Sequence, residues 1–313
     1  MPSERRAVID VGTNSVKLLV AEVDGHIVHP LLEKGEQTRL GRGFYETHVL
    51  QPDAITQTAY AVAAFSILAA QRESTFTRVI ATSAARDAVN QDELVDALHR
   101  ACGLRIEIIS GDEEAGLVFR GVASDPQLEG SKLLILDVGG GSTEFILGEK
   151  DHHSFRQSFA LGSVRLLEKL RPADPPSLAD LAGCRGWLKD LFRREIGPAL
   201  DPQFRDGIHQ GARLVGTGGT TTILARMEGR MGDFDRARIE GTCLSRSQVL
   251  EWMVHLWSLP LAERKKIVGL PSSRADIIPM GVAIYEAVME HFQFDEVYVS
   301  TRGLRFGAVM DSP

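Results

Sequence analysis

The chain has 313 residues, of which 43% are hydrophobic and 25% are charged, and its formal net charge is −7. This length allows two domains with separate cores, and the composition is that of an ordinary globular enzyme rather than of a disordered chain. The acidic balance argues against a nucleic-acid-binding protein, which would need a basic face, so a polyanionic ligand would have to meet locally positive groups or a bridging metal.

Residues 1–124 alternate between strand and helix patterns. Two β-branched runs around a glycine turn predict a hairpin over residues 7–23, and a third strand is expected from residue 31, ending in a basic loop. The other expected elements are strands at 77–82 and 105–109, and helices over 53–72, over 92–101, from 83 and from 111. Strands alternating with helices predict an α/β domain here.

A stretch with Asp, Pro and Gly at residues 124–131 marks the expected domain boundary. Residues 125–313 then open with a second glycine hairpin. The expected elements after it are a strand near 155–159, helices from 162, over 177–195, over 247–257 and after 274–278, a strand at 296–300 and a terminal helix from 303. We therefore expect a second α/β domain over residues 125–313.

The two hairpins carry related loops, which indicates a duplicated domain. The first reads Asp10-Val11-Gly12-Thr13-Asn14-Ser15, and the second reads Asp137-Val138-Gly139-Gly140-Gly141-Ser142-Thr143-Glu144. Glycines let backbone N–H groups approach a phosphate closely, and small polar side chains donate further hydrogen bonds. The expected phosphate-binding residues are Gly12, Thr13, Asn14, Ser15, Gly139, Gly140, Gly141, Ser142 and Thr143.

A third glycine loop leads into a helical pattern. Free N–H groups and the helix dipole converge at such a point, which is typical of an anion site. Its expected phosphate-binding residues are Gly216, Thr217, Gly218, Gly219 and Thr220. One glycine loop is weak evidence, because tight turns use glycine as well, but three in one chain favour phosphate binding. The Walker and Rossmann fingerprints are both absent from the sequence, which excludes those two classes.

Carboxylates stand beside these loops. Ionised Asp10, Asp137 and Glu144 only accept hydrogen bonds, so next to a polyanion they make sense if a cation lies between them. Mg²⁺ prefers such oxygen ligands. The sequence therefore predicts Mg²⁺ as the cofactor, with these three residues as candidate ligands.

Two further residues are candidates for catalysis. Glu114 follows a predicted strand at a helix start, where it could orient and deprotonate a water molecule; simple capping of the helix is the alternative. Arg86 follows another strand and could bind a phosphate in a bidentate way, the alternative being an ion pair with Asp87 or another helix carboxylate.

The chain opens without a secretion signal, and Cys102, Cys184 and Cys243 form no C-x-x-C pair, so we expect a cytoplasmic protein. The longest apolar run, residues 59–70, is too short to cross a bilayer and is expected to be a buried helix. We expect neither a membrane nor a nucleic-acid partner.

Taken together, these motifs resemble the exopolyphosphatase and guanosine pentaphosphate phosphohydrolase (Ppx/GppA) family. The matching stretches are residues 10–15, 39–41, 81–90, 110–115, 137–144, 162–166, 216–225 and 274–281. They span nearly the whole chain. Longer members of that family continue into a helical region that contributes to dimerisation and long-polymer binding. The chain therefore resembles the short, two-domain type. The sequence does not decide the assembly, and it leaves a homodimer open.

The resemblance implies an α/β fold with two ribonuclease-H-like domains around an interdomain cleft, as in actin-like ATPases and sugar kinases. It also implies hydrolysis of a terminal phosphoanhydride, with inorganic polyphosphate or guanosine penta- and tetraphosphate as partners. Glu114 corresponds to the family's catalytic base, and Asp137 and Glu144 to its metal-linked carboxylates. Arg86 and the loops at Asp10 and Gly216 fall where the family binds phosphate.

The leading hypothesis is thus an exopolyphosphatase that releases orthophosphate. A guanosine pentaphosphate 5′-phosphohydrolase is an alternative, because both substrates present a terminal phosphoanhydride. Two other classes stay open as well: a kinase or ATPase on the same fold, since the third loop also resembles the adenosine loop of sugar kinases, and a sensor that binds polyphosphate or guanosine tetraphosphate with little turnover.

Overall fold

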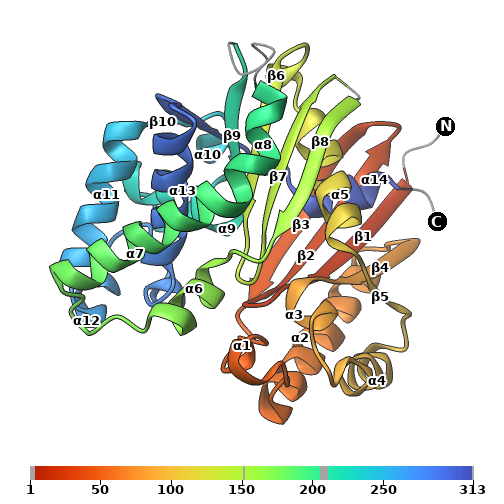
Figure 1. The fold of residues 1–313 in the computed structure, drawn as a ribbon. Coiled ribbons are helices and arrows are strands. Elements are labelled where there is room, and N and C mark those ends of the chain that lie inside the picture. Colours follow the sequence, from red (N-terminus) through yellow and green to blue (C-terminus); the bar gives the residue numbers. More distant parts are fainter. Residues whose placement is uncertain (1–3, 151, 205–210, 312–313) are drawn as a thin grey trace. The chain divides into compact units, whose positions relative to one another are not determined.

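The computed structural model describes residues 4–150, 152–204 and 211–311. Contacts divide the chain into two compact units, one formed by the residues up to 126 together with those from 302 onward, and the other by residues 127–301. Each unit holds one β-sheet and a hydrophobic core of its own (Figure 1). The two α/β domains predicted from the sequence are therefore present.

The first unit is built on a five-stranded sheet in the order β3-β2-β1-β4-β5. Its strands are β1 (Glu4–Val11), β2 (Val16–Asp24), β3 (Ile27–Glu36), β4 (Phe76–Ala81) and β5 (Ile106–Ile108). The first three pair antiparallel, while β4 runs parallel to β1 and β5 parallel to β4. The predicted hairpin is confirmed, but β3 starts four residues earlier than predicted, because Gly25 closes a tight turn at φ +58°.

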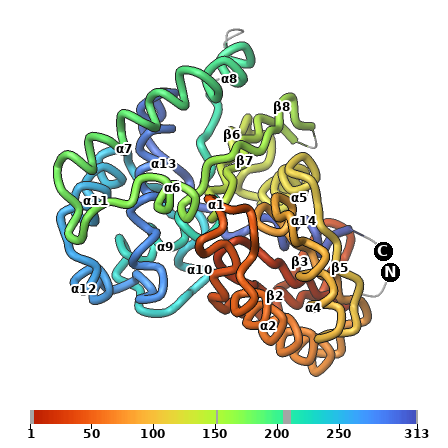
Figure 2. Tube along the Cα trace, turned by 60° about the horizontal axis from the view of Figure 1, so that its bottom comes forward, coloured from red at the N-terminus to blue at the C-terminus, as the bar shows by residue number. Residues whose placement is uncertain are grey.

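Helices cover this sheet. They are α1 (Phe44–Thr47), α2 (Pro52–Gln71), α3 (Ser83–Arg86), α4 (Gln91–Cys102), α5 (Gly111–Ala123) and α14 (Leu304–Met310). Helix α2 has the length and hydropathy of a membrane span, yet it buries Ala54, Val62 and Phe65 and packs against β1 and α4, so it is the core helix that the sequence predicted (Figure 2).

Helix α14 belongs to the first unit by its contacts, although the sequence analysis assigned everything after residue 124 to the second domain. It packs on α5 and on strands β1 and β2. The difference has a physical cause, because the packing joins residues almost 200 positions apart and leaves no local sequence pattern. The expected boundary at residue 124 itself lies within two residues of the observed crossing after residue 126.

The second unit holds a six-stranded sheet in the order β10-β11-β9-β6-β7-β8. Its strands are β6 (Lys132–Val138), β7 (Thr143–Glu149), β8 (His152–Phe159), β9 (Arg213–Thr217), β10 (Cys243–Ser245) and β11 (Glu296–Val299). Strands β6 to β8 pair antiparallel, and β9 and β11 add in parallel. This is the order of the first sheet with one edge strand added, so the duplication predicted from the two hairpins is confirmed.

The helices of the second unit pack around this sheet. They are α6 (Ser163–Leu170), α7 (Leu178–Leu191), α8 (Gly197–Phe204), α9 (Gly218–Glu228), α10 (Arg236–Ile239), α11 (Arg246–Ser258), α12 (Leu261–Arg264) and α13 (Ile278–His291). A π-helical turn over Phe192–Ile196 carries α7 into α8, past the point where the sequence predicted its end. Pro198 lies at the start of α8, and proline is tolerated in the first turn of a helix.

Candidate phosphate and metal site

The two hairpin loops have the same backbone construction. In the first, Asp10 lies opposite Lys17 on β1 and β2, and the N–H of Gly12 donates to the carbonyl of Ser15 at 3.0 Å. In the second, Asp137 lies opposite Glu144 on β6 and β7, and the N–H of Gly139 donates to the carbonyl of Ser142, also at 3.0 Å. The loops predicted from sequence similarity are thus equivalent in structure.

The segment at residues 39–41 holds the first loop in place by donating hydrogen bonds to the loop's carbonyl groups. The N–H of Arg39 donates to the carbonyl of Asn14 at 3.1 Å, and that of Gly41 donates to the carbonyl of Thr13 at 2.7 Å. A Cβ on Gly41 would lie 2.3 Å from Cγ2 of Thr13, so this approach requires glycine. The carbonyl side of the loop is occupied by protein, and an anion would meet its amide side.

The start of α6 fastens the second loop in the same way. The N–H groups of Ser163 and Val164 donate to the carbonyls of Gly139 and Gly140 at 3.0 and 2.8 Å. A Cβ on Gly162 would lie 2.4 Å from the carbonyl oxygen of Gly140. Thr143, predicted to bind phosphate, is fully buried in β7 and its hydroxyl donates to the carbonyl of Leu161, so its side chain supports the fold at this place.

Buried polar groups surround the first loop. Asn14 is only 7% exposed, and its Nδ2 makes no hydrogen bond within the part of the chain that the structure describes. The same holds for the hydroxyls of Thr38, just before the segment at residues 39–41, and of Ser83, at the start of α3. Buried polar atoms normally have a partner, so these groups suit a bound ligand or water. The sequence analysis missed Thr38 and Ser83, because a buried hydroxyl leaves no periodic signal.

Glu114 and Arg86 are brought together in the first unit. An Nη1 donor of Arg86 bonds Oε2 of Glu114 at 3.0 Å and also the carbonyl of Ile109 at 3.0 Å, while Asp87 lies 3.9 Å from its Nε. Glu114 is 8% exposed in the first turn of α5. Strands β1, β4 and β5 are parallel neighbours, so their carboxyl ends place the Gly12 loop, Arg86 and Glu114 at one edge of the sheet.

The helix-capping role belongs to the neighbour of Glu114. Ser110 is the N-cap of α5, and Glu113 accepts from its backbone N–H and its hydroxyl, both at 2.8 Å. These hydrogen bonds hold the pKa of Glu113 below its ordinary value. The capping considered for Glu114 is therefore done by its neighbour Glu113, whereas the carboxylate of Glu114 pairs with Arg86.

Asp10 lies in a partly buried position between positive charges. Burial raises the pKa of Asp10, while the charges of Lys17 and Arg305 act against that rise. Arg305 reaches this place from α14, where its Nη1 donates to the carbonyl of Leu18 at 2.8 Å. Asp10 therefore already has cations near it.

In the second unit, two carboxylates lie opposite each other on neighbouring strands. Asp137 and Glu144 are paired across antiparallel strands, which places their Cβ atoms about 5 Å apart on one face. Glu144 is 2% exposed and accepts from the hydroxyl of Ser158 at 2.7 Å. The described residues contain no group of three or more metal-ligating side chains. One or two carboxylates completed by substrate phosphates are what Mg²⁺ usually takes, so this pair fits that ion.

The third glycine loop is fixed beside Asp137. Thr217 pairs with Asp137 across the parallel strands β9 and β6, and α9 begins at the next residue. Gly218 has φ +85°, and a Cβ there would lie 2.2 Å from Oδ1 of Asp137. Among the described residues, the hydroxyl of Thr217, itself 1% exposed, has no hydrogen-bond partner. The second unit thus gathers Asp137, Glu144 and the third loop.

Tyr285 on α13 holds this arrangement together. It is fully buried, and its hydroxyl lies 3.0 Å from the carbonyl oxygen of Leu136 and 3.3 Å from that of Thr217. Burial raises the pKa of Tyr285 well above its ordinary value, and the charge of Asp137 adds to the rise. The sequence analysis missed this residue, which is one apolar position among many on a buried helix.

Comparison with known proteins decides the family. The model of the Ppx/GppA phosphatase family matches residues 19–312. The chain belongs to the Ppx/GppA phosphatase family. This membership confirms the resemblance inferred from the motifs, and with it the phosphoanhydride hydrolase class.

Individual members of the Ppx/GppA family match over most of the chain. Exopolyphosphatase 2 of Mycobacterium tuberculosis is 32% identical over an alignment of 326 positions that covers 99% of this chain and 99% of that protein. A guanosine-5′-triphosphate,3′-diphosphate pyrophosphatase of Vibrio parahaemolyticus is 28% identical over 97% of this chain and 58% of its own length. The structure of an exopolyphosphatase from Cytophaga hutchinsonii has a TM-score of 0.87 at 26% identity, covering 97% of this chain and 96% of that one. These matches confirm the predicted two-domain, actin-like α/β fold class.

Proposed function

We propose that the chain is an exopolyphosphatase that removes the terminal phosphate of inorganic polyphosphate as orthophosphate. The observation that carries this proposal is the nearly buried carboxylate of Glu114, held by Arg86 at the sheet edge that also bears the Gly12 loop. A carboxylate fixed in this way suits a general base for water. The full-length similarity to exopolyphosphatase 2 of Mycobacterium tuberculosis supports polyphosphate as the substrate.

In the proposed reaction, a water oxygen attacks the terminal phosphorus and the bond from that phosphorus to the bridging oxygen breaks. Glu114 takes a proton from the water, and the chain leaves with one phosphate fewer. Arg86 has five N–H donors in a planar fork, and the two hydrogen bonds to Glu114 and Ile109 leave others for a phosphoryl oxygen. Positioning and charge neutralisation supply most of the catalysis in such transfers.

The glycine loops and a bound metal would neutralise the negative charge that Arg86 leaves on the phosphates. The amide sides of the Gly12 and Gly139 loops and the start of α9 would donate to phosphate oxygens. Asp137 and Glu144 would hold Mg²⁺, which supplies charge neutralisation at the phosphates. Asp10, the third predicted Mg²⁺ ligand, would act next to Lys17 and Arg305. The positive charges of these two residues already offset part of its negative charge.

Cleavage from the chain end can be tested directly. Polyphosphate of a single chain length should yield orthophosphate and a product ladder that shortens one unit at a time, and polyphosphate blocked at both ends should resist. In isotopically labelled water the label should appear in the orthophosphate, since water is the acceptor. Internal fragments without orthophosphate, or transfer of phosphate to ADP in place of water, would contradict the proposal.

A second candidate is hydrolysis of guanosine pentaphosphate at its 5′ end. The specific observation in its favour is the similarity to the Vibrio parahaemolyticus pyrophosphatase. That relative is much longer than this chain, whereas exopolyphosphatase 2 matches it over nearly its whole length. Direct competition between the two substrates for one enzyme preparation separates these candidates.

A further inference from the structure

Helix α14 lies against α5, the helix that carries Glu114, through a seam of glycines. A Cβ on Gly307 of α14 would lie 1.9 Å from the carbonyl oxygen of Leu117, one turn along α5 from Glu114. A Cβ on Gly121 of α5 would lie 2.2 Å from the carbonyl oxygen of Gly303. Both views of the fold draw the two helices side by side (Figures 1 and 2). Backbone therefore touches backbone, with no flexible side chain between them to absorb a change.

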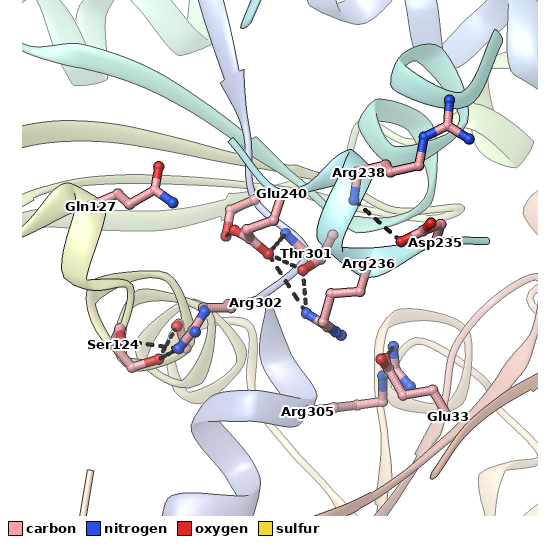
Figure 3. Close-up of polar contacts among 12 residues, drawn as sticks. Glu33, Ser124, Gln127, Asp235, Arg236, Arg238, Glu240, Thr301, Arg302 and Arg305 are labelled. Carbon is pink, nitrogen blue, oxygen red and sulfur yellow. Dashed lines mark hydrogen bonds and ion pairs between the residues drawn. The ribbon is translucent and has the colours of Figure 1, made fainter. Parts of the chain in front are cut away.

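The beginning of α14 is tied to the end of α5. Nη1 of Arg302 donates to the carbonyl of Ser124, the C-cap of α5, at 3.0 Å and to its hydroxyl at 3.2 Å (Figure 3). The preceding residue, Thr301, is held in the second unit by Glu240, which accepts from its N–H at 3.0 Å. The chain is thus fixed on both sides of the point where it passes from one unit to the other.

The far end of α14 is tied to α5 as well. Asp311 accepts from Nη2 of Arg120, a residue of α5, at 3.0 Å, and from Arg78 of β4 at 3.2 Å. Arg6 of β1 donates to the three backbone carbonyls of residues 309–311. In the first turn of the helix, Arg305 reaches the β1–β2 hairpin that carries Asp10. Helix α14 therefore contacts both the helix of Glu114 and the hairpin of the first loop.

We propose that α14 is a positioning element for Glu114, and that Gly307, Gly121 and Arg302 are the residues through which it acts. The proposal rests on the proposed function, in which Glu114 is the base. Ordinary van der Waals contact begins near 3.4 Å, so a methyl group at residue 307 requires the seam to open by more than 1 Å. A misplacement of about 1 Å can cost about 100-fold in rate, because the base must sit within hydrogen-bond reach of its water.

The test uses Gly307→Ala in the full chain. We expect kcat to fall about 10- to 100-fold with KM changed less than about 3-fold, since the added methyl group would meet Leu117 of α5 and not the hairpin of the first loop. The matched control is Gly183→Ala in α7, a helical glycine with open space around it, which should keep full activity. Thermal unfolding of both variants shows whether each is folded.

A double-mutant comparison separates positioning from general damage. If Gly307 acts through Glu114, then Gly307→Ala should cause no further loss in the Glu114→Gln background. Equal losses in both backgrounds, or an unchanged kcat in folded Gly307→Ala, would overturn the proposal. If Gly307→Ala does not fold, Arg302→Ala carries the same comparison, because it loosens the tie to Ser124 without adding bulk; we expect a smaller loss of about 3- to 10-fold.

Hydrogen exchange gives a readout that does not depend on activity. Displacement of α5 should speed exchange at the amide of Glu114, whose N–H donates to the carbonyl of Ser110 at 2.9 Å. Unchanged exchange there in Gly307→Ala would contradict the positioning role. A wild-type chain that releases no phosphate would refute the proposed function alone, and the exchange result would then decide this inference by itself.

Discussion

Replacing Glu114 by Gln tests the assignment of the general base. The two side chains have nearly the same shape, and the Gln carbonyl can still accept from Arg86, so the fold should be kept. What is lost is the charge and the ability to take a proton. General acid–base catalysis contributes about 10²- to 10⁴-fold, which is about 3–5 kcal/mol of transition-state free energy.

The cost in stability should be much smaller than the cost in activity. The substitution turns one charge-assisted hydrogen bond, between side chains that are 23% and 11% exposed, into a neutral-acceptor bond. Such a change is worth about 1–2 kcal/mol of unfolding free energy. The melting temperature should therefore fall by only a few degrees, since about 1 kcal/mol shifts a domain of this size by about 2–4 °C.

The assay is steady-state orthophosphate release, and the matched control is Glu113→Gln. Glu113 is the exposed neighbour that caps α5, and Gln serves equally well in a capping box. Glu114→Gln should lose turnover by at least about 100-fold and still bind polyphosphate, while Glu113→Gln stays near the wild type. The reasoning is wrong if folded Glu114→Gln keeps most of its activity, or if both variants lose it equally.

Three more predictions follow from the two hairpins and their support. Burial raises the pKa of Asp10, so its carboxyl keeps its proton to higher pH in the native state than in the unfolded chain, and its contribution to stability is lost as pH rises from about 4 through the native pKa. Asp10→Asn should therefore be increasingly more stable than the wild type in urea unfolding as pH rises over that range. A gain in stability that does not vary with pH would contradict this. The methyl group of Gly218→Ala would clash with Asp137, and alanine would be strained at the backbone φ of +85°. We therefore expect at least about 10-fold lower activity, a higher Mg²⁺ requirement and about 1–2 kcal/mol lower stability. An unchanged Mg²⁺ titration would refute the role of that contact. Tyr285→Phe removes the hydroxyl whose proton can go to the buried carbonyl of Leu136 or to that of Thr217, and should cost about 1–3 kcal/mol of unfolding free energy, measured as a lower urea midpoint. An unchanged midpoint would show that the hydroxyl is dispensable.

The sequence was sufficient to predict the local structure of the motifs that carry the candidate site. Both hairpin loops, the third loop at Gly216 and the helix start at Glu114 each occupy a few consecutive residues with a clear turn or cap pattern, and all appear where they were predicted. The duplicated strand order follows from the same repeat.

The parts that the sequence did not reveal depend on contacts between distant residues. Tyr285 bonds Leu136 across 149 positions, and α14 joins α5 through glycines that look like ordinary helix residues. Ser83 and Thr38 became candidates only when their burial was visible. No local periodicity encodes such contacts, because they are fixed by the packing inside each unit's own core.

The most direct test of the central claim is orthophosphate release by the wild-type chain with Mg²⁺, comparing polyphosphate, guanosine pentaphosphate and ATP under the same conditions, with Glu114→Gln beside each. The account predicts the highest kcat/KM on polyphosphate, abolished by the substitution and by chelation of the metal. Preference for guanosine pentaphosphate would contradict the assigned substrate, and tight polyphosphate binding without release from any compound would contradict the enzymatic role altogether.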